Sequence, residues 1–158
     1  MITPSIYKIR QLGLGTLYLM PKPSREWLDE DITYFASIKI TKIVSLLEEY
    51  EAFSLGLSEE RLICNQKGIE FIQFQIEDRG VPDIKIFRAL VTQLSLDLKN
   101  GENIAIHCRA GVGRAGLLSS CILKNCDIDV KRAIEEVSSA RRITIPDTKE
   151  QYKYILDF

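Results

Sequence analysis

Histidine is nearly absent from this 158-residue sequence, and cysteine is scarce. One histidine and four cysteines, none of them spaced as CxxC, argue against a zinc site. A disulfide framework is equally unexpected in a chain of this size. No apolar run approaches the length of a membrane span, and the first ten residues lack the apolar core of a signal peptide. We therefore expect a cytoplasmic protein that needs no metal and no other cofactor.

Neither acidic nor basic residues are in excess. The 21 basic and 22 acidic residues leave a net charge of −1, which gives no electrostatic reason to expect nucleic-acid binding. Apolar residues make up 46% of the chain, enough for a substantial core. No repeat, low-complexity tract or long linker divides the sequence. We expect a single domain over residues 1–158, and a monomer.

Strand and helix patterns alternate along the chain. Short apolar or alternating runs predict strands at 15–20, 42–47, 69–76 and 103–107. Helical spacing predicts helices at 24–38, 58–68, 83–101 and near 114–125, 129–140 and 147–157, with Ser24 and Asp83 as N-caps. This alternation predicts a three-layer α/β domain, with a mostly parallel central sheet flanked by helices. Ligands bind such sheets at the carboxyl ends of the strands.

The segment HCRAGVGR, residues 107–114, follows the last predicted strand and opens a helix. Gly111 and Gly113 permit backbone conformations closed to other residues, so that successive N–H groups can face one anion. The N-terminus of the following helix also favours negative charge. Arg114 can grip phosphate oxygens with its planar guanidinium, and the same field favours the thiolate of Cys108. Cys108 is therefore predicted to be a nucleophile that attacks a phosphate ester and forms a phosphocysteine.

The predicted phosphate cradle consists of the loop itself, Arg109, Ala110, Gly111, Val112, Gly113 and Arg114. The C-x5-R spacing alone is a weak signal, because Cys126 and Arg132 have the same spacing without any intervening glycine. His107 is adjacent to Cys108, but neighbouring strand residues point to opposite faces. We therefore predict that His107 is buried and hydrogen-bonds backbone near the loop.

A leaving alkoxide needs a proton, and the segment EDRGVPD offers three acids. Asp83 is explained as the N-cap of the next helix, and Glu77 falls at the end of a strand. Asp78 begins a loop whose glycine and proline allow it to move. Asp78 is therefore predicted to be the general acid, and then the general base for the water that releases phosphate.

These two segments together resemble the cysteine-dependent protein tyrosine phosphatases. HCRAGVGR resembles their H-C-x5-R signature, and DRGVP resembles their mobile acid loop, D-x-G-x-P. The spacing between the two loops fits the small dual-specificity subgroup, in particular its kinase-associated-phosphatase-like and bacterial members. The segments GIEFIQFQIEDRGVPD and TKEQYKYILDF also have counterparts there, so the resemblance covers most of the chain.

The resemblance implies that Cys108 is the nucleophile, Arg114 binds phosphate and Asp78 is the acid. It also matches Gln151 to a glutamine that positions the hydrolytic water in some relatives. From its residue type alone, Gln151 is interpreted as a solvated helix residue. The implied activity is that of a phosphatase acting on a phosphorylated protein or peptide.

Ala115 departs from the family pattern, which usually has Ser or Thr at this position. That hydroxyl donates a hydrogen bond to the cysteine sulfur and helps it leave in the second step. A hydrogen bond to a charged group contributes roughly 1.5–3 kcal/mol, so its loss slows hydrolysis by about ten- to a hundredfold. We expect an active but slowed enzyme that accumulates phosphocysteine.

Three alternatives remain open on the sequence. Arg79 and Arg109 would place positive charge at the rim of the site, which suits multiply phosphorylated ligands such as phosphoinositides. Val112, however, is apolar where the relevant lipid phosphatases often have lysine. Ala115 favours a catalytically weak phosphate-binding module instead, although such a module has no need of a nucleophile or an acid. A rhodanese-like sulfur transferase would have a shorter cysteine loop and no acid loop.

Cys64 raises a separate hypothesis about redox control. An activated cysteine oxidises readily, and Cys64 could resolve the resulting sulfenic acid if it lay near Cys108. The alternative interpretation of Cys64 is a buried, inert helix residue.

Overall fold

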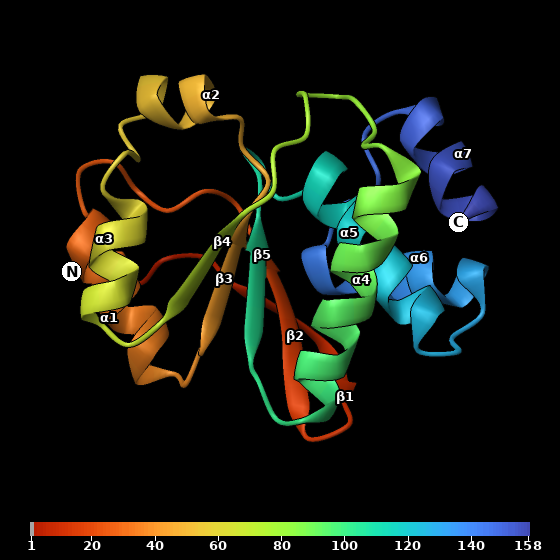
Figure 1. The fold of residues 1–158 in the computed structure, drawn as a ribbon, viewed down its shortest axis with the longest axis horizontal. Helices are drawn as coiled ribbons and strands as arrows, with labels where there is room; N and C mark the ends of the chain where they lie inside the picture. Colours follow the sequence, from red (N-terminus) through yellow and green to blue (C-terminus); the bar gives the residue numbers. More distant parts are fainter. Residues whose placement is uncertain (1) are drawn as a thin grey trace.

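A computed structural model describes residues 2–158, and within them five strands form one sheet in the order β1-β2-β5-β3-β4 (Figure 1). The strands are β1 Tyr7–Leu12, β2 Gly15–Met20, β3 Lys42–Ser45, β4 Glu70–Gln73 and β5 Ile104–His107. β1 pairs antiparallel with β2, and the other neighbours are parallel. The predicted mostly parallel α/β sheet is confirmed.

Helices cover both faces of this sheet (Figure 1). They are α1 Leu28–Ser37, α2 Glu49–Ser54, α3 Glu60–Gln66, α4 Ile84–Lys99, α5 Gly113–Asn125, α6 Val130–Arg141 and α7 Lys149–Asp157. α1 and α3 lie on one face, whereas α4 to α7 lie on the other. None of the helices within residues 2–158 is both long enough and apolar enough to cross a bilayer.

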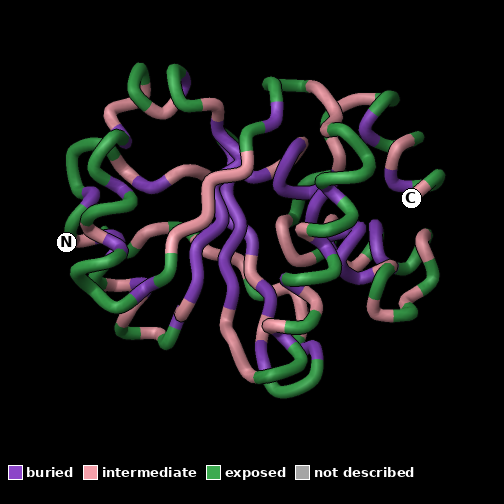
Figure 2. The backbone as a smooth tube through the Cα atoms, viewed as in Figure 1, coloured by how far each residue is buried: buried purple, intermediate pink, exposed green. Residues whose placement is uncertain are grey.

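The central strands are buried on both sides (Figure 2). Val44 and Ile106 belong to the apolar cluster beneath α4 and α5, whereas Ile43 and Ala105 belong to the cluster beneath α1 and α3. This division follows from the two-residue period of a strand, which sends successive side chains to opposite faces. The near-continuous apolar runs of β3 and β5 are therefore those of interior parallel strands.

The helix predicted over 24–38 begins later than expected. Its first helical residue is Leu28, and Ser24 is not its N-cap. The Ser24 hydroxyl instead accepts a hydrogen bond from the Trp27 backbone N–H, at 3.2 Å, in the turn before the helix. The other predicted cap is confirmed, because the Asp83 carboxylate accepts from the N–H groups of Lys85 and Ile86 at 3.0 and 3.3 Å.

The β4 edge of the sheet has one notable contact. Its outward-facing carbonyl at Phe71 accepts a hydrogen bond from the Arg61 guanidinium at 3.2 Å, and that guanidinium lies 4.9 Å from the centroid of the Phe71 ring. β4 itself is four residues long, shorter than the predicted 69–76. Beyond it, Phe74 and Ile76 still donate their backbone N–H groups to the β3 side of the sheet.

Candidate active site

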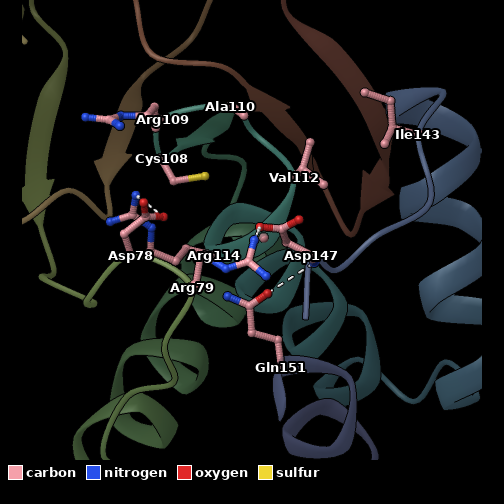
Figure 3. A pocket seen from close by; sticks show the side chains of 11 residues that line it. Asp78, Arg79, Cys108, Arg109, Ala110, Val112, Arg114, Ile143, Asp147 and Gln151 are labelled. Carbon is pink, nitrogen blue, oxygen red and sulfur yellow. Dashed lines mark hydrogen bonds and ion pairs between the residues drawn. The ribbon is translucent and has the colours of Figure 1, made fainter. Parts of the chain in front are cut away.

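A cavity of about 370 Å³ lies at the carboxyl ends of the parallel strands (Figure 3). The loop after β5 and the loop between β4 and α4 both open into it, together with the segment that leads into α7. Its lining residues are Asp78, Arg79, Cys108, Arg109, Ala110, Val112, Gly113, Arg114, Ile143, Asp147 and Gln151. The structure thus brings together all four predicted catalytic residues and most of the predicted phosphate cradle.

The two glycines of the loop are needed for different reasons. Gly111 has a φ of +71°, and a Cβ there would approach the carbonyl oxygen of Met20 at 2.5 Å. Gly113 is the first residue of α5, and a Cβ there would approach the Cβ of Asp147 at 2.9 Å. Gly111 therefore supplies the left-handed backbone that the turn requires, and Gly113 supplies space.

The outer side of the loop is braced through its carbonyl groups. The Lys22 N–H donates to the carbonyl of Arg109 at 3.1 Å, and the Arg141 side chain donates to those of Gly111 and Ala110 at 3.1 and 3.0 Å. In a trans peptide the next N–H points opposite to the carbonyl. The N–H groups that follow these three carbonyls are therefore turned away from the braces, as an anion-binding loop requires.

Cys108 and His107 occupy buried positions at the end of β5. Cys108 is only 3% exposed, and His107 is fully buried. Imidazole Nδ1 lies 3.0 Å from the Cys108 carbonyl oxygen, and Nε2 lies 2.7 Å from a carboxylate oxygen of Glu60. A carbonyl can only accept, so Nδ1 donates to Cys108, and Nε2 shares a hydrogen bond with the Glu60 carboxyl group. The prediction that His107 is buried and bonded to the loop backbone is confirmed.

Burial and the contacts with Glu60 and Cys108 act in opposite directions on the pKa of His107. Burial lowers the pKa of the imidazole. The charge and hydrogen bond of Glu60 and the hydrogen bond to the Cys108 carbonyl raise it by a larger amount, so the net pKa lies above its usual value. The environment of His107 therefore favours the protonated imidazole more than water does, and the ring lies directly behind the cysteine loop.

The Arg114 guanidinium is fixed from several directions. Its side chain is 2% exposed, and its two terminal nitrogens lie 2.8 and 2.9 Å from the two carboxylate oxygens of Glu51. It also donates to the carbonyl of Ile76 at 2.9 Å and to Asp78 Oδ1 at 3.2 Å. Burial raises the pKa of Glu51, but the hydrogen bond and charge of Arg114 lower it more, so its net pKa is below the usual value.

The acid loop contributes Asp78 on one side of the cavity. Its side chain is 52% exposed, so it can meet both Arg114 and a bound molecule. The next residue, Arg79, has a φ of +63°, and its guanidinium lies 2.7 Å from Asp147 Oδ2 (Figure 3). Glu77 is exposed and contributes only its carbonyl, which accepts from the Gly80 N–H at 2.8 Å.

Gln151 is fully buried and lines the cavity, so its interpretation as a solvated helix residue is wrong. Its side-chain oxygen accepts from the N–H groups of Asp147 and Thr148 at 3.1 and 3.2 Å, closing a capping box at the start of α7. Its amide nitrogen donates to the carbonyl of Gly80 at 3.2 Å. One side chain therefore connects the helix cap to the acid loop.

Cys64 is buried in the apolar cluster beneath α1 and α3, whereas Cys108 belongs to the cluster on the other face of the sheet. Burial raises the pKa of the Cys64 thiol to about 12. This environment supports the interpretation of Cys64 as an inert helix residue. Across residues 2–158, no three His, Cys, Asp or Glu side chains gather in a way that could hold a metal ion.

Four residues of the site were not predicted from the sequence: Glu51, Glu60, Arg141 and Asp147. Each acts by holding another side chain or a backbone group. A signal existed for Glu51, because a buried arginine requires a carboxylate, and the segment EEYE follows a predicted strand that ends at the same edge of the sheet. No comparable signal existed for the other three.

Known proteins resemble this chain in sequence and in fold. Residues 12–151 match the family model described as "Swiss Army Knife protein, DSP-PTPase phosphatase domain". Rat cyclin-dependent kinase inhibitor 3 is 33% identical over 98 residues, which cover 61% of this chain and 46% of that protein. Bovine protein tyrosine phosphatase domain-containing protein 1 is 33% identical over 114 residues, covering 66% of this chain and 14% of that protein.

Among solved structures, kinase associated phosphatase with its catalytic-site cysteine replaced by serine superposes with a TM-score of 0.90 at 24% identity, covering 99% of this chain and 94% of that chain. Tk-PTP in the active form gives a TM-score of 0.78 at 22% identity, covering 99% and 96%. These structures share the fold. The chain spans about half the length of the cyclin-dependent kinase inhibitor 3 proteins it matches.

Proposed function

The chain belongs to the family of DSP-PTPase phosphatase domains, and from this membership we propose that it hydrolyses phosphate monoesters on proteins or peptides through a phosphocysteine intermediate. The observation that carries the proposal is the convergence of Cys108, Arg114 and Asp78 on one cavity. These residues come from two segments about thirty positions apart in the sequence. A nucleophile, an anion ligand and an acid are the three groups that phosphoryl transfer to cysteine requires.

In the first step the Cys108 thiolate attacks phosphorus. A P–S bond forms as the ester P–O bond breaks, and Asp78 gives its proton to the leaving oxygen. The loop N–H groups and Arg114 hold the remaining phosphate oxygens. One terminal nitrogen of Arg114 now contacts Asp78, and a bound phosphate oxygen would take over that contact and release Asp78 toward the leaving group.

In the second step a water molecule attacks phosphorus from the side the leaving group has vacated. Asp78, now a carboxylate, takes the proton of that water, the P–S bond breaks, and inorganic phosphate and the Cys108 thiolate are formed. Gln151 lines the same cavity and is assigned the role of orienting this water. His107 contacts the Cys108 carbonyl through Nδ1 and, when protonated, stabilises negative charge on the neighbouring sulfur in both steps.

The charges around the cavity favour a substrate with one phosphate group. Arg79 is paired with Asp147 at 2.7 Å, and Arg109 lies 3.8 Å from a carboxylate oxygen of Glu51. Both rim arginines that would suit a phosphoinositide are therefore already faced by carboxylates. This supports a phosphorylated protein or peptide over a multiply phosphorylated lipid.

A phosphate-binding module of low activity is the second candidate, and Ala115 is the observation that favours it. Ala115 is fully buried in the apolar cluster that also contains Cys108. It offers the sulfur no hydroxyl donor, so the second step is the slow one. The presence of both the nucleophile and the acid favours a catalytic function over a binding module.

Hydrolysis of 4-nitrophenyl phosphate under reducing conditions tests the proposal. Cys108→Ser should abolish turnover, Asp78→Asn should reduce it, and Ala115→Ser should raise kcat by about ten- to a hundredfold. Cys126→Ser is the matched control, because Cys126 shares the C-x5-R spacing but lies outside the cavity. Wild-type protein that binds phosphate without any turnover would support the binding module instead.

A further inference from the structure

The acid loop is connected to the rest of the molecule by three polar contacts around the cavity. Asp78 contacts Arg114 at 3.2 Å and Arg79 contacts Asp147 at 2.7 Å (Figure 3). The Gly80 carbonyl accepts from the Gln151 side chain at 3.2 Å. A phosphate bound to Arg114 competes with the first contact. The loop is then held by the second and third contacts at the moment when Asp78 must deliver its proton.

The backbone of Arg79 gives a reason to single out the second contact. Its φ of +63° lies in the left-handed region, which is unfavourable for a residue with a Cβ. Arg79 is followed by a glycine and makes no side-chain polar contact in residues 2–158 other than the one to Asp147. A strained conformation persists only where its surroundings enforce it. The turn hydrogen bond from the Gly80 N–H to the Glu77 carbonyl, at 2.8 Å, closes the backbone around Arg79, and the ion pair with Asp147 is the side-chain contact that connects this turn to α7.

Asp147 is in turn a fixed anchor. Its backbone N–H donates to the Gln151 side chain at 3.1 Å, within the capping box of α7. Its Cβ lies so close to Gly113 that a Cβ on that glycine would come within 2.9 Å of it. Asp147 is therefore attached to the first turn of α7 and packed against the first residue of α5.

We propose that Asp147 is a positioning residue for the general acid: through Arg79 it holds the acid loop where Asp78 reaches the leaving oxygen. This inference rests on the proposed function, since it needs Asp78 to be the acid. Asp147 is not assigned any contact with the reacting atoms. It acts on the population of the loop conformation that is competent for proton transfer.

Two substrates with different leaving groups distinguish a misplaced acid loop from a general loss of structure. A 4-nitrophenolate ion leaves with little help, whereas a phenolate ion needs the proton of Asp78. A loosened acid loop therefore slows phenyl phosphate more than 4-nitrophenyl phosphate. A damaged nucleophile or phosphate loop slows both substrates alike.

The experiment measures kcat/KM for phenyl phosphate and for 4-nitrophenyl phosphate, and reports the ratio of the two. Asp147→Asn and Arg79→Gln should each lower this ratio about two- to fivefold, the range expected for one exposed ion pair. The double variant should lower it no further, because both changes remove the same contact. Asp147→Glu, which keeps the carboxylate, should restore most of the ratio.

Two further variants make the result decisive. Asp29→Asn removes another exposed aspartate, on α1, that forms an ion pair at 3.6 Å with Lys67, the residue directly after α3. This variant should leave the ratio unchanged. Asp78→Asn should lower the ratio more than any other variant. If Asp78→Asn lowers it but Asp147→Asn does not, or if the two single effects add in the double variant, the positioning role is refuted. If Asp78→Asn leaves the ratio unchanged, the acid assignment itself fails, and the inference fails with it.

Discussion

Replacement of Glu51 by glutamine should destabilise the protein and weaken its hold on phosphate. Glu51 places its two carboxylate oxygens 2.8 and 2.9 Å from the Arg114 guanidinium, and the two side chains are 6% and 2% exposed. A glutamine has nearly the same shape, but it presents an amide N–H₂ to one of these guanidinium nitrogens. The change therefore removes the negative charge and one acceptor while leaving the packing intact.

The expected magnitude follows from the burial of the pair. Removing one member of a buried ion pair typically costs about 3–5 kcal/mol, because the other charge is left uncompensated. Arg114 keeps the carbonyl of Ile76 and the half-exposed Asp78, so the lower end, about 3 kcal/mol, is expected here. For a chain of this size each kcal/mol lowers Tm by about 2–4 °C, which gives a decrease of about 6–12 °C.

Thermal unfolding with and without inorganic phosphate measures both consequences. Phosphate should raise the Tm of the wild type through binding, and should raise that of Glu51→Gln by less. Glu49→Gln is the control, since it removes one exposed negative charge from the same helix. A Tm within about 2 °C of the wild type, with the same phosphate-induced shift, would refute the reasoning.

The difference in stability between the wild type and Glu51→Gln should depend on pH in a defined direction. Arg114 holds the folded-state pKa of Glu51 below its unfolded value, so the carboxylate contributes its full stability above about pH 4.5. That contribution is lost as the pH falls through the lower folded-state pKa. The gap between wild type and Glu51→Gln should therefore persist at neutral pH and close in acid.

Three other outcomes are expected. Gly111→Ala should abolish phosphate binding, measured calorimetrically, because its Cβ would lie 2.5 Å from a backbone carbonyl and its φ is +71°; unchanged affinity would contradict this. The stability that protonated His107 contributes should be complete below about pH 6.5 and should be lost as the pH rises through its raised folded-state pKa. Urea unfolding should therefore show that the loss of unfolding free energy caused by Glu60→Gln becomes smaller at alkaline pH; a loss that grows with pH would contradict this. Thiol mapping after peroxide treatment should find no Cys64–Cys108 disulfide, since the pKa of the buried Cys64 thiol is raised to about 12; a bridge between them would overturn the assignment.

The parallel strands and the cysteine loop could be predicted because their signals are local. β3 and β5 are buried on every residue, so their apolar runs are read directly from the sequence. The loop from Cys108 to Arg114 joins a nucleophile, two glycines and an arginine within seven consecutive residues. The burial of these strands and the composition of this loop follow from residues close together in the sequence, so they can be recognised without knowledge of the tertiary structure.

β1 and α2 could not be predicted for the opposite reason. β1, YKIRQL, mixes charged and apolar residues and gains its hydrogen bonds only from β2, with a register shift between Lys8 and Arg10. α2 is six residues long, too short to show a helical period. It is stabilised by the capping box of Glu48 and Glu51 and by the ion pair to Arg114, a residue 63 positions away.

The misread residue, Gln151, shows how a local rule can mislead. At the third position of a helix, a glutamine three residues after a threonine is a capping-box signal, which accounts for the side chain without any distant partner. Here the same side chain also donates to Gly80, on a loop 71 positions away, and becomes fully buried. Burial of a polar residue is decided by its distant partners, which the sequence does not display.

The contact between Arg61 and Phe71 has a consequence for how copies of this chain meet one another. A strand at the edge of a sheet offers free carbonyl and N–H groups to which a strand of another molecule can add, and this is a common route to aggregation. β4 is such an edge, but Arg61 donates to the outward carbonyl of Phe71 and places a positive charge over the ring of the same residue. A second molecule that approached this edge would have to displace a bonded guanidinium, so the same side chain that completes the fold also discourages strand-by-strand self-association.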